Sequence, residues 1–128
     1  MPYTTILIVD DSATTRAMIR RIIGMCQLPV EEILEARDGA EALELMARLP
    51  VCLVLADLHM PVMGGAEMTQ RMMGDPGLSR IPVVIISAEP NVDRIDRLLE
   101  SGVRGYLPKP FTPESFRNLL SCVLPDAA

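Results

Sequence analysis

The sequence predicts an α/β fold, in which a doubly wound sheet of five parallel strands is covered on both faces by five helices. Short apolar runs alternate along the chain with segments of helical periodicity, and this alternation is typical of parallel strands joined by right-handed crossovers. The runs are rich in Ile, Val and Leu, as expected for strands buried on both faces. The expected strands are residues 5–10, 32–36, 51–57, 81–87 and 104–109.

Each of the first two strands is followed by apolar residues at helical spacing. This spacing covers residues 18–25 after the first strand and residues 40–47 after the second. The second of these helices is preceded by Asp38, with Glu41 three residues later, a pattern that resembles a capping box. We therefore interpret Asp38 as a helix cap and not as a residue of a functional site.

Three more helices are expected after the last three strands. Their apolar positions span residues 68–73, 92–99 and 116–123, with stops at the GDPG sequence, near Gly102 and at Pro125. The methionines at these spacings are interpreted as core filling. Pro108 falls inside the last strand, which favours an edge position because proline has no N–H to donate to a neighbouring strand.

Length and composition indicate one domain with an aliphatic core. The 128 residues suffice for a core without disulfides or a structural metal, so residues 1–128 are expected to form a single domain. The three cysteines lie far apart without a CxxC pair, and we interpret Cys26, Cys52 and Cys122 as buried thiols. A net charge of -5 argues against binding nucleic acid, which requires a basic surface.

The sequence contains no signal for a membrane or for export. No apolar run approaches the roughly 20 residues that a membrane-spanning helix needs. The first residues lack the basic region and the cleavage site of a signal peptide. We therefore expect a cytoplasmic protein that does not insert into a membrane.

Polar side chains stand at the carboxyl ends of four of the five expected strands. Asp10 and Asp11 follow the first strand, Asp57 the third, Ser87 the fourth and Lys109 the fifth. Ligands of open α/β sheets bind at this edge, near the point where the strand order reverses. These side chains are therefore expected to surround one crevice, to which the second strand contributes only apolar and capping residues.

The chemistry of this set favours phosphoryl transfer. Three carboxylates at short range repel one another unless a cation compensates, and Mg²⁺ is held by carboxylates, carbonyls, water and phosphate oxygens. The ammonium of Lys109 adds a fixed cation, and the hydroxyl of Ser87 adds a donor. Together these groups provide a metal site and an acidic nucleophile such as Asp57.

Each of these residues also has an ordinary structural interpretation. The helix cap after the first strand could be Asp10, Asp11, Ser12, Thr14 or Thr15. A single lysine could be solvated, and a single serine could belong to a turn. Their joint placement at one edge of the sheet favours the functional interpretation.

Four motifs in this order resemble those of response-regulator receiver domains, and the resemblance covers the whole chain. They are VDDS at residues 9–12, ADLHMPVMGG at 56–65, IISAE at 85–89 and GYLPKPF at 105–111. The resemblance implies a flavodoxin-like fold with the strand order 2-1-3-4-5. It also implies a two-component signalling protein that is not an enzyme, beyond catalysing its own phosphorylation and dephosphorylation.

Carried over to this sequence, the resemblance implies a phosphoacceptor and its metal ligands. Asp57 would accept a phosphoryl group from a phosphohistidine. Asp10 and Asp11 would hold Mg²⁺, or Mn²⁺ in its place, together with Asp57 and the backbone carbonyl of His59. The sequence itself supplies the oxygen ligands that such an ion prefers.

The resemblance also implies a switch. Lys109 would bond the phosphoryl oxygens, and its peptide bond to Pro110 is expected to be cis. On activation Ser87 would move toward the phosphoryl group and let Tyr106 rotate inward. An active conformer would then gain population, because the phosphoryl group makes contacts that only this conformer offers.

Two positions are expected to set the lifetime of the phosphorylated state. Members of the family tune this lifetime through the positions that His59 and Glu89 hold here, by controlling access and the placement of water. As a side chain, His59 is expected to be partly exposed beside the crevice. Gly64-Gly65 stands where most regulators have Asp-Gly, a difference that we interpret as neutral.

The implied partners are proteins. A sensor histidine kinase or a histidine phosphotransfer protein would supply the phosphoryl group, and a downstream protein would bind a face made of the fourth helix, the fifth strand and the fifth helix. The side chains expected on this face are Arg94, Arg97, Arg104, Tyr106 and Arg117. Met1 shortly before the first strand and the LPDAA tail favour a complete chain or an N-terminal receiver.

Other functions are weighed against this one. A flavodoxin-like FMN carrier shares the sheet, but two aspartates precede the SATT sequence, no glycine opens the turn and few aromatic residues could stack on a flavin. An aspartate-nucleophile phosphatase would have Asp-x-Asp after the first strand, where Ser12 occupies the third position. A phosphorylation-independent receiver-like scaffold would keep the fold without the chemistry, yet every acceptor-site group is present.

Overall fold

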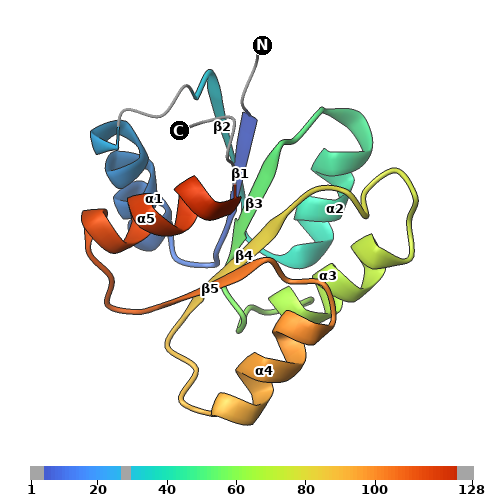
Figure 1. Cartoon of the computed structure of the whole chain (residues 1–128). Helices are drawn as coiled ribbons and strands as arrows, with labels where there is room; N and C mark the ends of the chain where they lie inside the picture. Colours follow the sequence, from blue (N-terminus) through green and yellow to red (C-terminus); the bar gives the residue numbers. More distant parts are fainter. Residues whose placement is uncertain (1–4, 27–29, 124–128) are drawn as a thin grey trace.

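The computed structural model describes residues 5–26 and 30–123, in which strands and helices alternate (Figure 1). The strands are β1 (Thr5–Val9), β2 (Glu32–Ala36), β3 (Leu53–Ala56), β4 (Val83–Ser87) and β5 (Gly105–Pro108). The helices are α1 (Ala13–Met25), α2 (Gly39–Arg48), α3 (Gly65–Met73), α4 (Val92–Glu100) and α5 (Pro113–Val123). The predicted stop at Pro125, Met1 and the tail at 124–128 lie outside the described residues.

All strands pair in parallel in one sheet of order β2-β1-β3-β4-β5, which confirms the predicted fold class and topology. Each predicted strand is present, four of them with ends shorter by one or two residues than predicted. β5 lies at one edge of the sheet and ends at Pro108, as expected for a residue that cannot donate to a neighbouring strand. Asp38 caps α2 by accepting a hydrogen bond from the Glu41 amide, as predicted.

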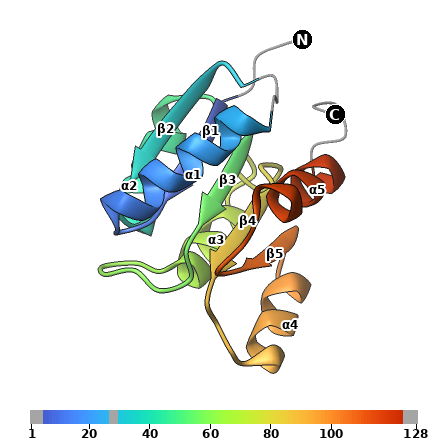
Figure 2. The ribbon, with the colours of Figure 1, turned by 90° about the vertical axis from the view of Figure 1, so that its left-hand side faces the viewer.

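Successive strand residues face opposite layers of helices, so the sheet is covered on both sides (Figures 1 and 2). Ile6 and Ile8 pack into a core that α1 and α5 complete, with Phe116 buried in it. Leu7 and Val9 pack into a second core beneath α2, α3 and α4. Because both faces are buried, the strands show continuous apolar runs in the sequence.

The prediction that all three cysteines are buried is wrong for two of them. Cys26 is buried, and its Sγ lies 3.8 Å from the carbonyl oxygen of Pro113. Cys52 and Cys122 are exposed. Cys52 directly precedes β3 and Cys122 lies in the last turn of α5, and at such positions an apolar neighbourhood in the sequence does not ensure burial.

The methionines divide between the core and the surface. Met46, Met68 and Met72 are buried between α2, α3 and the sheet, as predicted. Met18 and Met25 are exposed to 44% and 60%, so core filling does not describe them. Both belong to α1, whose buried stripe is made instead of Ile19, Ile22 and Ile23.

One residue in the loop from β3 to α3 has a strained backbone. Val62 has a φ of 67° and is 83% exposed. The Met63 amide donates to the Pro61 carbonyl across it, at 2.7 Å. A β-branched side chain is disfavoured in this left-handed region, and no burial compensates for the strain.

Substitution of Val62 by asparagine is expected to raise the free energy of unfolding by about 1 kcal/mol, because asparagine tolerates a positive φ. Denaturation in urea measures this change. Val92 is a matched control, since it is 66% exposed at the start of α4 and is not among the residues with a positive φ. A gain of equal size in Val92→Asn would contradict the explanation by strain.

Candidate functional site

The carboxyl ends of four strands bring the predicted polar residues together. One carboxylate oxygen from each of Asp10, Asp11 and Asp57 lies within 4.8 Å of the other two. The Lys109 Nζ lies 3.3 Å from Asp10 Oδ2 and 3.4 Å from Asp57 Oδ2. Ser87 ends β4, the neighbour of the strand that leads to Asp57. Three carboxylates and one ammonium thus cluster at the carboxyl edge of the sheet, as the sequence predicts.

Asp10 is the most deeply placed of the three acids, with a side chain that is only 4% exposed. Burial raises the pKa of its carboxyl group, and the nearby charge of Asp57 acts in the same direction. A hydrogen bond from the Ser12 amide and the Lys109 ammonium both oppose this shift. The cap of α1 is Ser12, whose hydroxyl accepts a hydrogen bond from the Thr15 amide, so the aspartates are not needed for capping.

Asp57 presents its two carboxylate oxygens to different groups. Oδ1 accepts hydrogen bonds from the backbone amides of Leu58 and His59, at 2.7 and 3.4 Å. Oδ2 faces Lys109. Asp57 does not cap the next helix, since the N-cap of α3 is Gly64 and makes no side-chain hydrogen bond.

The backbone that carries Asp57 is packed closely against the start of α3. A β-carbon on Gly65 would lie 2.4 Å from the carbonyl oxygen of Asp57, and one on Gly64 would lie 2.6 Å from the carbonyl oxygen of Leu58. Both distances are far below van der Waals contact, and both involve backbone atoms that cannot swing away. With this backbone the loop leaves no room for a side chain at Gly64, so an aspartate there would require the loop to shift. That the replacement is neutral stays a prediction.

Tyr106 forms hydrogen bonds with the backbone at the end of β4 and in the loop that follows it. Its hydroxyl donates to the Ser87 carbonyl at 2.8 Å and accepts from the Glu89 amide at 3.1 Å. Burial raises the pKa of the Tyr106 hydroxyl. Through its hydroxyl, the half-buried Tyr106 thus connects Ser87, which is predicted to contact the phosphoryl group, with Glu89, which is predicted to affect its hydrolysis.

Glu89 links the loops after β3 and β4. Its Oε1 lies 3.1 Å from His59 Nε2 and 3.6 Å from Arg94 Nη1, and its Oε2 accepts a hydrogen bond from the Asn91 amide. The Asn91 amide, followed by His59, lowers the pKa of the Glu89 carboxyl group. The His59 side chain is 60% exposed, as expected, whereas that of Glu89 is 7% exposed.

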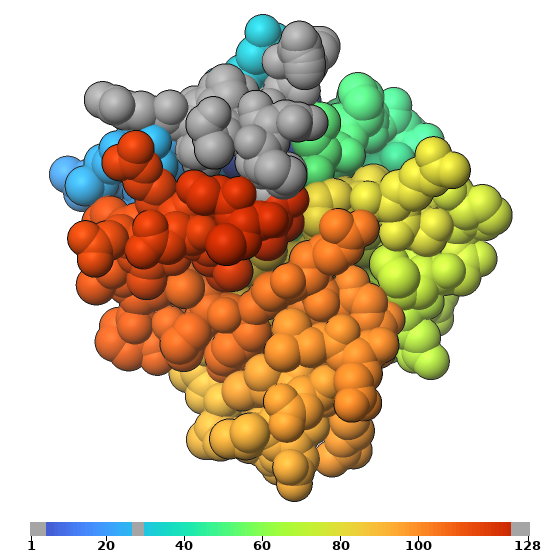
Figure 3. Space-filling model, viewed as in Figure 1, coloured from blue at the N-terminus to red at the C-terminus, as the bar shows by residue number. Residues whose placement is uncertain are grey.

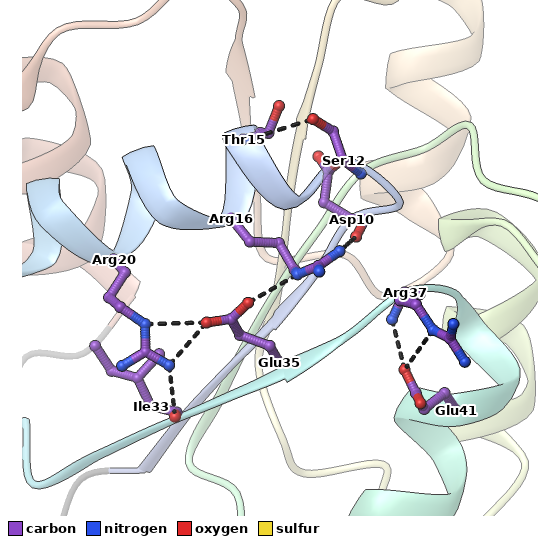
Figure 4. Close-up of polar contacts among 9 residues, drawn as sticks. All are labelled: Asp10, Ser12, Thr15, Arg16, Arg20, Ile33, Glu35, Arg37 and Glu41. Atoms are coloured by element: carbon purple, nitrogen blue, oxygen red, sulfur yellow. Dashed lines mark hydrogen bonds and ion pairs between the residues drawn. The ribbon is translucent and has the colours of Figure 1, made fainter.

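Two further residues reach the site without being predicted. Arg16 on α1 donates to the backbone carbonyl of Asp10, and Glu35 on β2 holds the Arg16 guanidinium (Figure 4). The second strand thus supplies a charged residue, Glu35, which is connected to the site only through Arg16. An acidic residue next to the carboxyl end of β2, where Glu35 precedes Ala36, is the signal that could have identified it.

The family model described as "Response regulator receiver domain" matches residues 6–121. The chain belongs to this family. Receiver domains are regulatory modules and not conventional enzymes, and they bind Mg²⁺ at a cluster of aspartates like the one described above. Membership in the receiver family favours a signalling role over the alternative of a flavodoxin-like FMN carrier.

Several characterised receivers are similar to the chain over most of its length. It is 34% identical to chemotaxis protein CheY1 of Helicobacter pylori over 120 residues, which cover 93% of this chain and 95% of that protein. It is 38% identical to two-component response regulator ORR11 of Oryza sativa over 121 residues, 94% of this chain and 80% of that protein. The structure of Vibrio cholerae chemotaxis protein CheY4 superposes with a TM-score of 0.85 at 28% identity, covering 96% of this chain and all of that receiver.

The cis peptide bond expected between Lys109 and Pro110 is present.

Among residues 5–26 and 30–123, no helix has the length and apolar character to span a bilayer.

Proposed function

We propose that this receiver accepts a phosphoryl group on Asp57 from a sensor histidine kinase or a histidine phosphotransfer protein, and thereby changes its affinity for a downstream protein. The observation that carries the proposal is the cluster of three carboxylates at the carboxyl edge of the sheet, two of which contact the Lys109 ammonium. Such an arrangement has a nucleophile and a fixed cation within one crevice.

The donor set fits Mg²⁺. Asp10, Asp11 and Asp57 offer carboxylate oxygens close enough to share one ion, and the Lys109 charge balances one of the three. These three side chains and the backbone carbonyl of His59 would hold the ion, which when bound neutralises negative charge on the phosphoryl group. Mn²⁺ is an alternative, since the similar response regulator Rcp1, 26% identical with a TM-score of 0.81, has a Mn²⁺-bound form.

Different residues of the chain have different roles in the phosphoryl transfer. The amides of Leu58 and His59 hold Asp57 Oδ1, so Oδ2 beside Lys109 is the attacking oxygen. An O–P bond forms at Asp57 while the P–N bond of the donor breaks, and the donor imidazole keeps the electron pair of that bond. Lys109 donates to the transferred oxygens, and the Ser87 hydroxyl contacts them in the active conformer.

Incubation with Mg²⁺ and a small acyl phosphate, followed by intact-mass measurement, tests the proposal. We expect one labile phosphoryl adduct in the wild type and none in Asp57→Asn. The absence of an adduct under conditions that label a control receiver would overturn the proposal and would favour the phosphorylation-independent scaffold.

The proposed output face joins α4, β5 and α5, which lie next to one another on the side of the molecule shown in Figure 3. Arg97 and Arg104 are exposed there, and Arg94 is exposed but paired with Glu89. Arg117, expected on this face from the sequence, is exposed but lies beside Met25 and Cys26, on the side of α5 that faces α1. Tyr106 connects this face to the β4–α4 loop. Movement of Ser87 toward a phosphoryl group would change the Tyr106 contact, and so the shape of the face.

The pair of His59 and Glu89 is expected to slow hydrolysis of the phosphorylated state, because it bridges the two loops beside Asp57. We expect His59→Ala and Glu89→Ala to hydrolyse several-fold faster, and the double variant to be no faster than either single one. Decay of the phosphorylated protein after removal of the donor gives these rates. Unchanged rates in both single variants would show that the pair does not control access.

A further inference from the structure

A chain of charged side chains outside the cluster of aspartates ends on the backbone of Asp10 (Figure 4). The Arg16 Nη1 donates to the Asp10 carbonyl at 2.6 Å, and its Nε donates to Glu35 Oε1 at 2.8 Å. Arg20 bonds the other oxygen of Glu35 through Nε and Nη2, at 3.0 and 2.8 Å. Both arginines therefore bind the Glu35 carboxylate. Their other contacts differ, because Arg16 donates to the Asp10 carbonyl and Arg20 donates to the Ile33 carbonyl.

The Asp10 backbone is held from both sides by these contacts. Its amide donates to the Ala36 carbonyl on β2 at 3.1 Å, and its carbonyl accepts from Arg16. The carbonyl of Asp10 and the amide of Asp11 belong to one planar peptide. The bond from Arg16 therefore orients the peptide from which the Asp11 side chain emerges, and Asp11 is one of the three acids of the cluster.

The environment of Arg16 suits a positioning role. Its side chain is 13% exposed, against 47% for Arg20. Hydrogen bonds from the two arginines lower the pKa of the Glu35 carboxyl group, so Glu35 stays charged and holds the guanidinium in place. A planar guanidinium with fixed donors can bond a carboxylate and a carbonyl at the same time.

We propose that Arg16 is a positioning residue for the metal site: through the Asp10 carbonyl it sets the direction of Asp10 and Asp11 toward a divalent ion. This inference rests on the proposed function, because it presumes that the aspartates hold Mg²⁺. Arg16 donates to the Asp10 backbone carbonyl and to Glu35, so it would act on the metal ligands through the backbone.

Electrostatics alone predicts the opposite effect of removing Arg16. A cation near three carboxylates repels Mg²⁺, so loss of its charge would tighten binding of the ion. Loss of positioning would instead weaken binding, because the ligands would have to be ordered when the ion binds. The sign of the change in affinity therefore separates the two explanations.

The test is the dissociation constant for Mg²⁺ in wild type, Arg16→Met and Arg20→Met, measured by calorimetry together with thermal unfolding in the absence of metal. Each variant loses one arginine contact to Glu35, so both are expected to unfold at lower temperature. We expect Arg16→Met to bind Mg²⁺ about tenfold more weakly, and Arg20→Met to stay within about twofold of the wild type.

Each other outcome counts against the inference in a distinct way. Wild-type or tighter binding by Arg16→Met would overturn the positioning role. Equal weakening in both variants would mean that the loss of the ion pairs loosens the fold as a whole, and would also overturn it. If the wild type itself binds no Mg²⁺, the proposed metal site is wrong, and the inference is overturned with it.

Discussion

Replacement of Lys109 by methionine is expected to reduce the rate of Asp57 phosphorylation by about a hundredfold or more, the effect of removing one preorganised donor from a site where negative charge develops. The Lys109 Nζ already lies 3.4 Å from Asp57 Oδ2 and 3.3 Å from Asp10 Oδ2, so it is in place before the donor arrives. Methionine keeps much of the side-chain length and removes the charge. Phosphorylation by an acyl phosphate at saturating Mg²⁺, followed by intact mass, measures the rate.

Arg48 provides the control for this substitution. It is exposed in the last turn of α2, at the end of that helix remote from the carboxyl edge of the sheet, so Arg48→Met removes a positive charge far from the site. We expect a wild-type rate in that variant. A wild-type rate in Lys109→Met would mean that the ammonium does not stabilise the transfer, and would remove Lys109 from the proposed machinery.

Replacement of Gly65 by alanine is expected to destabilise the protein by about 2 to 3 kcal/mol, the cost of forcing extra volume into a packed region. The new β-carbon would lie 2.4 Å from the Asp57 carbonyl oxygen and 3.1 Å from Ile85 Cδ1. Relief of this contact requires movement of the peptide that carries Asp57. We therefore expect slower phosphorylation as well as a lower midpoint of denaturation.

Gly24 is the matched control, since a β-carbon added there would meet nothing within 4 Å and the residue lies inside α1. Alanine favours a helix over glycine by up to about 1 kcal/mol, so Gly24→Ala is expected to stabilise the protein. Equal stability in wild type and Gly65→Ala would show that the loop relaxes without cost, and would contradict the close packing described here.

The fold and the centre of the site followed from local features of the sequence. Parallel strands buried on both faces produce continuous apolar runs, and their carboxyl ends lie at one edge whatever the details of packing. Strand order and alternation are therefore enough to bring Asp10, Asp57 and Lys109 together at one edge of the sheet. The roles assigned to these residues remain predictions, because they depend on a phosphoryl group and a metal ion.

Contacts between surface side chains did not follow from the sequence in the same way. Arg16 and Glu35 are ordinary charged residues in their own segments, and their meeting depends on how α1 lies over β2. The exposure of Cys52 depends likewise on where β3 begins. Such features arise from the relative placement of elements, which apolar periodicity does not specify.

The position of Lys109 has a practical consequence, because Lys109 is the only lysine in the sequence. An isotopic label introduced on lysine gives one side-chain amine signal in a magnetic resonance spectrum. That amine lies within hydrogen-bonding distance of both Asp10 and Asp57. The unmodified chain therefore carries its own spectroscopic reporter for metal binding and phosphorylation, with no mutation or attached probe.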